Sequence, residues 1–241
     1  MENLLRSKPK LVVLTGAGIS AESGLSTFRG TGGMWEGNKI EDVATPEAWR
    51  RNPIRVLEFY NQRRAQLPLV NANEAHILLK KLEAFYDVHI ITQNVDDLHE
   101  RSQSSNILHL HGELVKVRSE LNDYIILDWG YKPLNWGDKG PDGAQLRPHV
   151  VWFGEAVPAM FKAESMSSQA DILVVIGTSL QVYPAANLIY TAPSHAEIWY
   201  IDPQPATITG LKKLHVLPQK ATTGMKELYQ ILTSKCNPDE R

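Results

Sequence analysis

Short apolar runs alternate with amphipathic patterns along most of the chain. The apolar runs typical of buried strands are Lys10–Thr15, Val88–Thr92, Ile107–Leu110, Ile172–Ile176 and Glu197–Ile201. Apolar residues at helical spacing predict helices over Glu47–Leu67, Asn73–Phe85, Pro158–Gln169, Ala185–Tyr190 and Met225–Leu232. Strands that alternate with helices indicate an α/β protein with a parallel, doubly wound sheet.

Two stretches interrupt this alternation. Residues 30–70 begin Gly-rich and then become helical, and residues 114–147 are rich in Gly, Asp and Trp with little periodicity. Both leave the predicted sheet near the ends of strands, so we expect them to form a separate module. We therefore predict a Rossmann-like domain from residues 1–30, 71–113 and 148–241, and a smaller inserted module from residues 31–70 and 114–147.

Composition narrows the class of protein. The 241 residues carry a net charge of −2, which gives no electrostatic reason to expect a nucleic acid or an anionic membrane as partner. No apolar run approaches the roughly 18 residues that span a bilayer, and residues 1–10 lack the pattern of a signal peptide. The single cysteine, Cys236, excludes an intrachain disulfide and a thiolate-rich metal site. We expect a cytoplasmic, monomeric enzyme.

A glycine-rich loop follows the first predicted strand. Gly16, Gly18 and Ala21 satisfy the loose dinucleotide-binding pattern, and a helix that opens at residues 20–22 would offer its N–H groups to a phosphate. The alternative is a plain strand–turn–helix packing role. The next residues, 26–35, lack the second strand and acidic residue of a dehydrogenase. They indicate instead a lid that carries Phe28 and Arg29 and closes over a reactive cofactor.

Polar residues follow the second predicted strand. Ligands in open α/β sheets bind beyond the carboxyl ends of the strands, and Gln93, Asn94 and Asp96 lie at such an end. Their amides and carboxylate can bind ribose hydroxyls and a carboxamide. The alternative is that Asn94 or Asp96 caps the next helix.

Two histidines and two further segments complete the set of candidates. Strand alternation places His109 and His111 on one face. His111 lies beside a glycine and could act as a general base near neutral pH, whereas the simpler interpretation of His109 is a structural role. The segment after Ile172–Ile176 offers hydroxyls to a phosphate or forms a simple turn. Residues 148–155 and 182–184 resemble exposed extended segments that could hold a peptide by strand addition.

The ordered motifs GAGIS, TFRG, TQNVD, LHG, PHVVWFGE, GTSL and VYPAA together resemble the sirtuin family over nearly the whole chain. The resemblance implies a Rossmann-like NAD-binding domain and removal of acyl groups from the lysines of proteins or peptides. NAD would be consumed, with nicotinamide and O-acyl-ADP-ribose as products. The resemblance also implies that His111 and Asn94 are catalytic.

The resemblance also implies two sets of binding residues. The cofactor set is Gly16, Ala17, Gly18, Ile19, Ser20, Ala21, Glu22, Thr27, Phe28, Arg29, Trp35, Gln93, Asn94, Val95, Asp96, Gly177, Thr178, Ser179, Tyr200, Ile201, Asp202 and Ala221. The substrate set is Tyr60, Arg63, Val151, Phe153, Gly154, Glu155, Val182 and Tyr183. Asp202 stands near a position where the family often has Asn, and its carboxylate could accept the adenosine ribose hydroxyls.

Tyr60 and Arg63 lie three residues apart and therefore share one helix face. On spacing alone, a surface Arg beside a half-buried Tyr is the simpler interpretation. A Tyr-x-x-Arg pair, however, resembles the sirtuin subclass that removes malonyl, succinyl and glutaryl groups, because the guanidinium binds a carboxylate with a planar fork of donors. Ala21 and Thr27 also resemble that subclass, and Ala21 would leave room for the acyl group. We predict a preference for succinyl and malonyl groups.

The sequence departs from the family in its zinc module. Sirtuins usually carry four zinc-binding cysteines between the LHG and WFGE motifs, but residues 114–147 contain neither cysteine nor histidine. We therefore predict that the protein binds no zinc. We expect aromatic packing to replace the metal, from Tyr124, Trp129, Tyr131 and Trp136.

Three other functions are compatible with parts of this pattern. Mono-ADP-ribosyl transfer would use the same chemistry on a different acceptor. A sensor of NAD or ADP-ribose would keep the glycine loop but would not need His111, Asn94 and Asp96 together. A dehydrogenase is disfavoured because the acidic residue of a second strand is missing.

Overall fold

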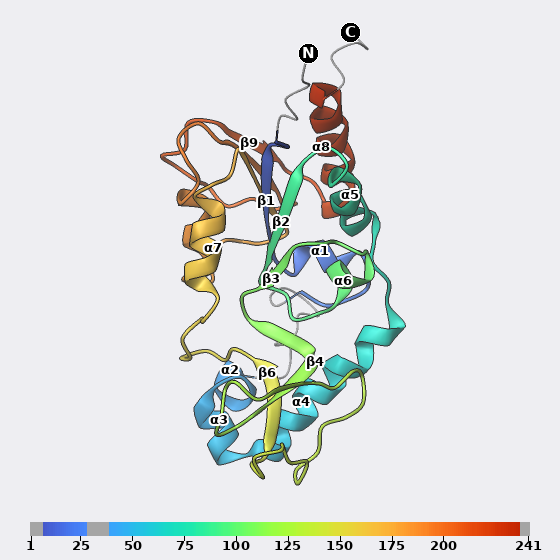
Figure 1. Cartoon of the computed structure of the whole chain (residues 1–241), viewed down its shortest axis with the longest axis vertical. Coiled ribbons are helices and arrows are strands. Elements are labelled where there is room, and N and C mark those ends of the chain that lie inside the picture. Colours follow the sequence, from blue (N-terminus) through green and yellow to red (C-terminus); the bar gives the residue numbers. More distant parts are fainter. Residues whose placement is uncertain (1–6, 28–38, 237–241) are drawn as a thin grey trace.

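The computed structural model describes residues 7–27 and 39–236, and within them a parallel sheet of six strands forms the upper part of the molecule (Figure 1). Its strands lie in the order β3–β2–β1–β7–β8–β9. Their bounds are β1 Lys10–Thr15, β2 Asp87–Thr92, β3 Ile107–His109, β7 Ile172–Ile176, β8 Glu197–Ile201 and β9 Leu214–Leu217. This is the doubly wound order, and the direction of winding reverses between β1 and β7. The predicted fold class is confirmed.

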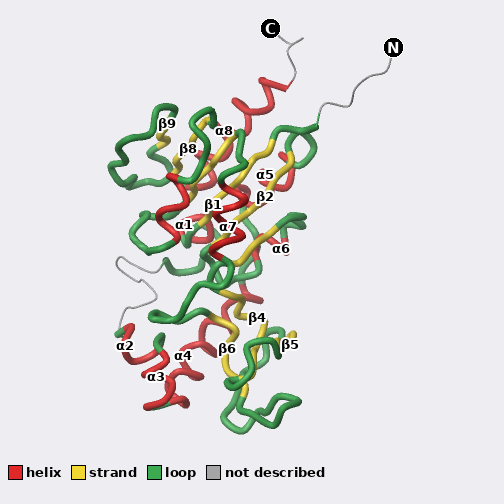
Figure 2. The backbone as a smooth tube through the Cα atoms, turned by 60° about the vertical axis from the view of Figure 1, so that its left-hand side comes forward, coloured by secondary structure: helices red, strands yellow, loops and turns green. Residues whose placement is uncertain are grey.

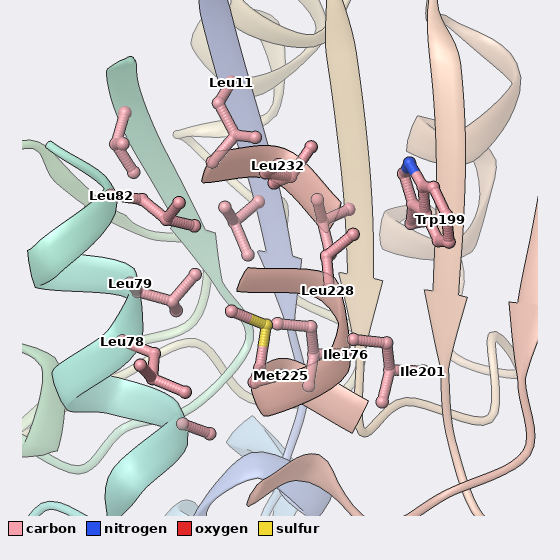
Figure 3. Packing of buried hydrophobic residues seen from close by; sticks show 14 of the residues in the cluster. Leu11, Leu78, Leu79, Leu82, Ile176, Trp199, Ile201, Met225, Leu228 and Leu232 are labelled. Carbon is pink, nitrogen blue, oxygen red and sulfur yellow. The ribbon is translucent and has the colours of Figure 1, made fainter. Parts of the chain in front are cut away.

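Helices cover both faces of this sheet. Helices α5 (Glu74–Leu82) and α8 (Ala221–Cys236) pack on one face, where Leu79 and Leu228 meet the strands (Figure 3). The opposite face is covered by α7 (Met160–Ser167) and by the 3₁₀ helix η2 (Ala185–Tyr190). Side chains 11–14 of β1 alternate between the two hydrophobic clusters, so this part of the strand is buried on both faces and its sequence is continuously apolar.

A smaller module lies below the sheet (Figures 1 and 2). It has its own hydrophobic cluster, distinct from the two that flank the main sheet. Its antiparallel strands lie in the order β5–β4–β6. Its elements are α2 Ile40–Val43, α3 Pro46–Arg51, α4 Pro53–Gln66, η1 Leu67–Leu69, β4 Gly112–Ser119, β5 Ile126–Asp128 and β6 Leu146–Val150.

A polar clamp joins α4 to the strands of this module. Arg64 is completely buried, and its guanidinium donates to the carbonyl of Leu114 at 2.7 Å and to Asn61 Oδ1 at 2.6 Å. The Asn61 side chain in turn bonds both the carbonyl and the N–H of Leu134, each at 2.9 Å. Burial lowers the pKa of Arg64 to about 10, so it is charged at neutral pH. Charged hydrogen bonds of this kind contribute about 1.5–3 kcal/mol each.

The four aromatic residues expected to replace zinc do not form a core. Tyr124 is 96% exposed and Trp136 is 56% exposed, while Tyr131 uses its hydroxyl to donate to Asp97 at 2.5 Å. Trp129 packs at the edge of the cluster, and Trp136 contacts Trp49 with ring centroids 6.2 Å apart. The expectation was therefore wrong in its main point. The interior is supplied instead by aliphatic residues of the helices and strands and by other aromatic residues, namely Trp49, Phe59, Tyr60 and Trp152.

Several predicted elements have different bounds in the structure. The helix predicted over 47–67 is two helices, because Pro53 begins α4 and the side chain of Asn52 caps it by accepting from the Arg55 N–H. Residues 148–150 belong to β6 rather than to an exposed segment, and Trp152 is buried. Strand β9 and the antiparallel sheet were not predicted.

Two short helices, α1 (Gly18–Ala21) and α6 (Leu98–Arg101), follow the first two strands of the main sheet. Among the helices in the described residues, none is long and apolar enough to cross a membrane.

Candidate active site

The loops after β1 and β7 contact each other where the winding of the sheet reverses. The Gly18 N–H donates to the carbonyl of Gly177 at 2.8 Å. A Cβ at Gly16 would lie 2.7 Å from that same oxygen, and one at Gly18 would lie 2.6 Å from Gly177 Cα. These glycines are therefore required for the two loops to pack. The Gly18 amide is used within the protein, which agrees with the packing alternative, and the cofactor role of Gly16 and Gly18 stays a prediction.

The loop after β2 also contacts the loop after β7. Gln93 donates from Nε2 to Thr178 Oγ1 at 3.2 Å, and the carbonyl of Thr178 accepts from the Tyr200 hydroxyl at 2.9 Å. The side chains of Tyr200 and Ile201 are fully buried in the core, as is that of Ile19. The structure corrects the prediction for these three side chains: they support the loops and do not line the site.

A cavity of about 40 Å³ lies between the segments that follow β1 and β2, the C-terminal part of α4 with η1, and the start of β4. Six predicted site residues line it, namely Ala17, Ser20, Arg63, Asn94, Val95 and Asp96. Sequence reasoning missed the other lining residues, which are Leu25, Ser26, Gln66, Leu67 and Leu114. Gln66 and Leu67 follow Arg63 by three and four residues, so helical spacing could have indicated them. Nothing in the sequence pattern distinguishes the remaining three.

Asn94 presents an unpaired acceptor in the wall of this cavity. Its amide nitrogen donates to the carbonyl of Gly16 and to Ser20 Oγ, both at 3.2 Å. Its Oδ1 atom is buried and has no hydrogen-bond partner among the described residues. Because buried polar atoms are rarely left without a partner, this oxygen is suited to accept from a hydroxyl or an amide of a bound ligand. The expected dinucleotide fits that requirement.

Asp96 is a buried carboxyl beside Asn94. Its oxygens accept from Ser20 Oγ at 3.0 Å and from the Leu98 N–H at 3.1 Å. The second bond reaches the first residue of α6, but the N-cap of that helix is Asp97, so Asp96 is not the N-cap that the alternative proposed. Burial raises the pKa of Asp96 to about 6. A carboxyl that exchanges its proton near this pH can both donate to and accept from a primary amide.

The raised pKa of Asp96 predicts a pH-dependent gain in stability for Asp96→Asn. The folded protein holds this proton more tightly than the unfolded chain does, so stability falls as the pH rises from about 4 to about 6. At neutral pH the buried charge costs up to about 3 kcal/mol, at about 1.4 kcal/mol per pKa unit. We expect Asp96→Asn to have a higher melting temperature than the parent at pH 7.5 and the same one at pH 4. An equal difference at both pH values would contradict this assignment.

His111 follows β3 and has one anchored ring nitrogen. Its Nδ1 atom lies 3.1 Å from the carbonyl of Gln93, which can only accept, so Nδ1 carries the hydrogen. The Nε2 atom of the neutral ring therefore keeps its lone pair. Burial lowers the pKa of His111 although the Gln93 contact opposes this, and the neutral ring thus predominates at physiological pH. His111 has the tautomer and charge that a general base requires.

Other predicted cofactor residues are dispersed around this centre. Ala21 and Ser179 are exposed and do not line the cavity, and Thr27 is half-buried. Glu22 is engaged elsewhere, because its carboxylate accepts from the N–H and hydroxyl of Thr222 at 2.9 Å and so caps α8 next to Ala221. Asp202 accepts from the Gln204 N–H, and burial raises its pKa. Phe28, Arg29 and Trp35 lie outside the described residues.

The two acyl-directed residues both lie on α4. The Arg63 guanidinium stacks on the Phe59 ring, 3.3 Å from its centroid, and donates to the Phe59 carbonyl at 2.9 Å. Tyr60 is only 5% exposed, and its ring packs edge-on against the same Phe59 ring. Arg63 therefore lines the cavity, while Tyr60 lies in the core of the small module and not in the cavity wall.

The predicted peptide-binding residues lie along the segments after β6 and β7. The N–H of Val151 donates to the carbonyl of His111 at 2.9 Å, which ties this segment to the base. The exposed residues of the set are Phe153, Gly154 and Tyr183, with Val182 half-buried. Glu155 is engaged within the protein, because its carboxylate accepts from Arg147 at 2.7 Å and from the Trp152 N–H at 2.8 Å. The carboxylate of Glu155 thus has a structural role, and a substrate contact at this residue stays a prediction.

Comparisons with known proteins agree with this geometry. The sequence model of the Sir2 family matches residues 16–184. An NAD-dependent protein deacylase of Helicobacter pylori (strain J99) is 54% identical over 218 residues, which is 90% of this chain and 93% of the relative. A solved Sir2 homologue, a point mutant in complex with ADP-ribose, has 36% identity and a TM-score of 0.87, with 98% of each chain covered. A Sir2 homologue in complex with NAD has 36% identity and a TM-score of 0.84 over 95% of this chain and 91% of that one.

Proposed function

Because the chain belongs to the Sir2 family, we propose that it is an NAD-dependent protein lysine deacylase that prefers succinyl and malonyl groups and also removes acetyl groups. The observation that carries this proposal is the His111 ring. Its Nδ1 atom is held by the Gln93 carbonyl, and its neutral Nε2 atom is left as a base. The same loop supplies the unpaired Asn94 oxygen and the Asp96 carboxyl.

Each of these side chains has a separate role in the proposed reaction. NAD, when bound, would supply the glycosidic bond to nicotinamide, with nicotinamide as the leaving group and the acyl oxygen as the nucleophile. Asp96 holds the carboxamide, and Asn94 binds the ribose or a water molecule through Oδ1. His111 takes a proton from a ribose hydroxyl at Nε2. General-base catalysis of this kind typically accelerates a reaction by about 10²–10⁴-fold.

The proposed acyl preference is supported by the position of Arg63. Its guanidinium lies in the wall of the cavity that Asn94 and Asp96 also line. Burial lowers its pKa to about 10, so it is charged at neutral pH and can bind the distal carboxylate of an acyl chain.

We also propose that the small module comprises residues 31–70 and 114–147 and that it folds without zinc. The α4 clamp supports this, because Arg64 and Asn61 fix both strand β4 and the loop before β6. Val150 and Trp152 belong to the same hydrophobic cluster, which favours moving the second boundary from residue 148 to a point after Trp152.

The test is a comparison of three matched peptides that carry acetyl-, succinyl- or malonyl-lysine, each incubated with NAD and analysed by mass spectrometry. We expect free lysine peptide, nicotinamide and O-acyl-ADP-ribose, with faster turnover of the two acidic acyl groups. A protein or peptide that gains ADP-ribose would indicate mono-ADP-ribosyl transfer instead. The absence of nicotinamide release from all three peptides would exclude both reactions.

A further inference from the structure

Two histidines at the end of β3 hold consecutive carbonyls of the loop after β2. His111 Nδ1 lies 3.1 Å from the Gln93 carbonyl, and His109 Nδ1 lies 3.1 Å from the Asn94 carbonyl. Strand alternation puts both rings on the same side of the chain, where this loop passes. The two histidines therefore anchor the loop in the same way, residue by residue.

The two rings differ at the second nitrogen. His109 Nε2 lies 2.8 Å from Glu100 Oε1, on α6, and the His109 side chain is only 9% exposed. A backbone carbonyl and a carboxylate only accept hydrogen bonds, so both ring nitrogens of His109 must carry a hydrogen. His109 is thus an imidazolium, whereas His111 is neutral. Burial opposes the charge, but the hydrogen bond and charge of Glu100 outweigh it and raise the pKa of His109.

We propose that His109 and Glu100 form a charged clamp that positions Asn94 for the reaction. The His109 ring fixes the Asn94 carbonyl, and so fixes the backbone from which the Asn94 side chain projects toward the cavity. Glu100 orients the ring and keeps it protonated, and a charged donor gives the stronger hydrogen bond. His109 touches neither substrate nor reacting atoms, so it is a positioning residue. The inference rests on the proposed function, because it assigns a consequence for turnover.

The acidic residues around the clamp form ion pairs. Glu113 on β4 offers an oxygen within 4.8 Å of the ligand atoms of His109 and Glu100, so the three could in principle hold a metal ion. Glu113, however, pairs with Lys116 at 2.8 Å, and Glu100 pairs with His109 at the same distance. We therefore assign the cluster to two ion pairs. The Glu113 carboxylate also helps to raise the pKa of His109.

Two further titratable groups face the clamp from neighbouring segments. Asp96, on the loop after β2, feels the positive charge of His109, which favours its ionised form against the effect of burial. His99, on α6, is completely desolvated, and its pKa is lowered by burial and by the charges of His76 and His109. His99 is therefore neutral and does not compete for Glu100.

The protonation of His109 can be measured by ¹⁵N NMR of the histidine rings at pH 7, in a uniformly labelled protein without cofactor. We expect both ring nitrogens of His109 to be protonated and only one of His111, with assignments from His109→Asn and His111→Ala. Glu100→Gln should return His109 to a neutral ring at this pH. A neutral His109 in the parent protein would overturn the proposal. The measurement needs no turnover, so its result does not depend on the proposed function.

A matched pair of variants tests the positioning role. The amide nitrogen of Asn occupies the place of the imidazole Nδ1, and that of Gln occupies the place of Nε2. His109→Asn thus keeps a donor to the Asn94 carbonyl, and His109→Gln loses it. We expect kcat on the best acyl peptide to fall about tenfold in His109→Gln and about threefold or less in His109→Asn, with KM for the peptide unchanged in both.

The comparison between these two variants separates positioning from stability. If His109 were merely structural, both variants would lose melting temperature together and kcat would not differ between them, which would overturn the proposal. If the parent protein released no nicotinamide from any peptide, the proposed function would fail, and the NMR result would still decide whether the clamp is charged.

Discussion

Replacing His111 by alanine should lower turnover of acyl-lysine peptides by at least about 100-fold without unfolding the protein. The ring is held through Nδ1 by the Gln93 carbonyl, and Nε2 is the atom left to accept a proton. Alanine removes that base, and general-base catalysis is worth about 10²–10⁴-fold. The loss to the fold is small, because within residues 7–27 and 39–236 the half-buried ring makes one hydrogen bond and lies outside the three hydrophobic clusters.

The measurement is the rate of nicotinamide release with a saturating acyl peptide and NAD, alongside circular dichroism and the melting temperature. His195→Ala is the matched control, because His195 is exposed and pairs with Asp171 at the opposite edge of the main sheet. The control should keep the parent rate. Parent-like rates in His111→Ala would end the assignment of this residue as the base.

The main sheet and the centre of the site were predictable from the sequence for a common physical reason. Strands buried on both faces are continuously apolar, and the carboxyl ends of parallel strands meet at one edge. This geometry brings the glycine loop after β1, the polar residues after β2 and the loop after β7 to the same edge of the sheet. Gln93 and Thr178, 85 residues apart, meet there through a hydrogen bond.

The features that could not be predicted depend on contacts between residues far apart in the chain, which produce no recognisable pattern in the local sequence. The sequence around Arg64 favours a surface cation, yet the side chain is fully buried because α4 brings it under the Leu114 carbonyl. Glu22 follows the glycine loop and was expected at the cofactor, but it caps a helix that begins some 200 residues later. Strand β5 has exposed residues at both ends, so it carries no apolar alternation to recognise.

The two histidines near the end of β3 also depend on contacts with distant residues. The glycine beside His111 favoured that residue as the base and left His109 as structural, but the sequence could not predict their charge states, because that of His109 depends on Glu100, which lies on another element. A residue's charge state is set by the partners that the fold supplies. The sequence therefore indicated which histidine is the candidate base, and the structure added its tautomer.

Replacing Arg63 by methionine should reduce desuccinylation by about 10–100-fold and change deacetylation little. Arg63 is held over the Phe59 ring and by the Phe59 carbonyl, so its guanidinium lies in the cavity wall at a fixed position. A charged hydrogen bond to the acyl carboxylate contributes about 1.5–3 kcal/mol, and about 1.4 kcal/mol corresponds to tenfold. An acetyl group has no carboxylate to lose. Methionine keeps the helix and much of the apolar stem.

The experiment measures kcat/KM for succinyl- and acetyl-lysine versions of one peptide with the parent, Arg63→Met and a matched Tyr60→Phe variant. Tyr60 is buried beside Phe59 and outside the cavity wall, so removal of its hydroxyl should lower desuccinylation less than loss of Arg63 does. The decisive quantity is the ratio of the two activities, because damage to the fold or to NAD binding lowers both together. Equal losses on both peptides in Arg63→Met would remove Arg63 as the determinant of acyl preference while leaving His111 as the base.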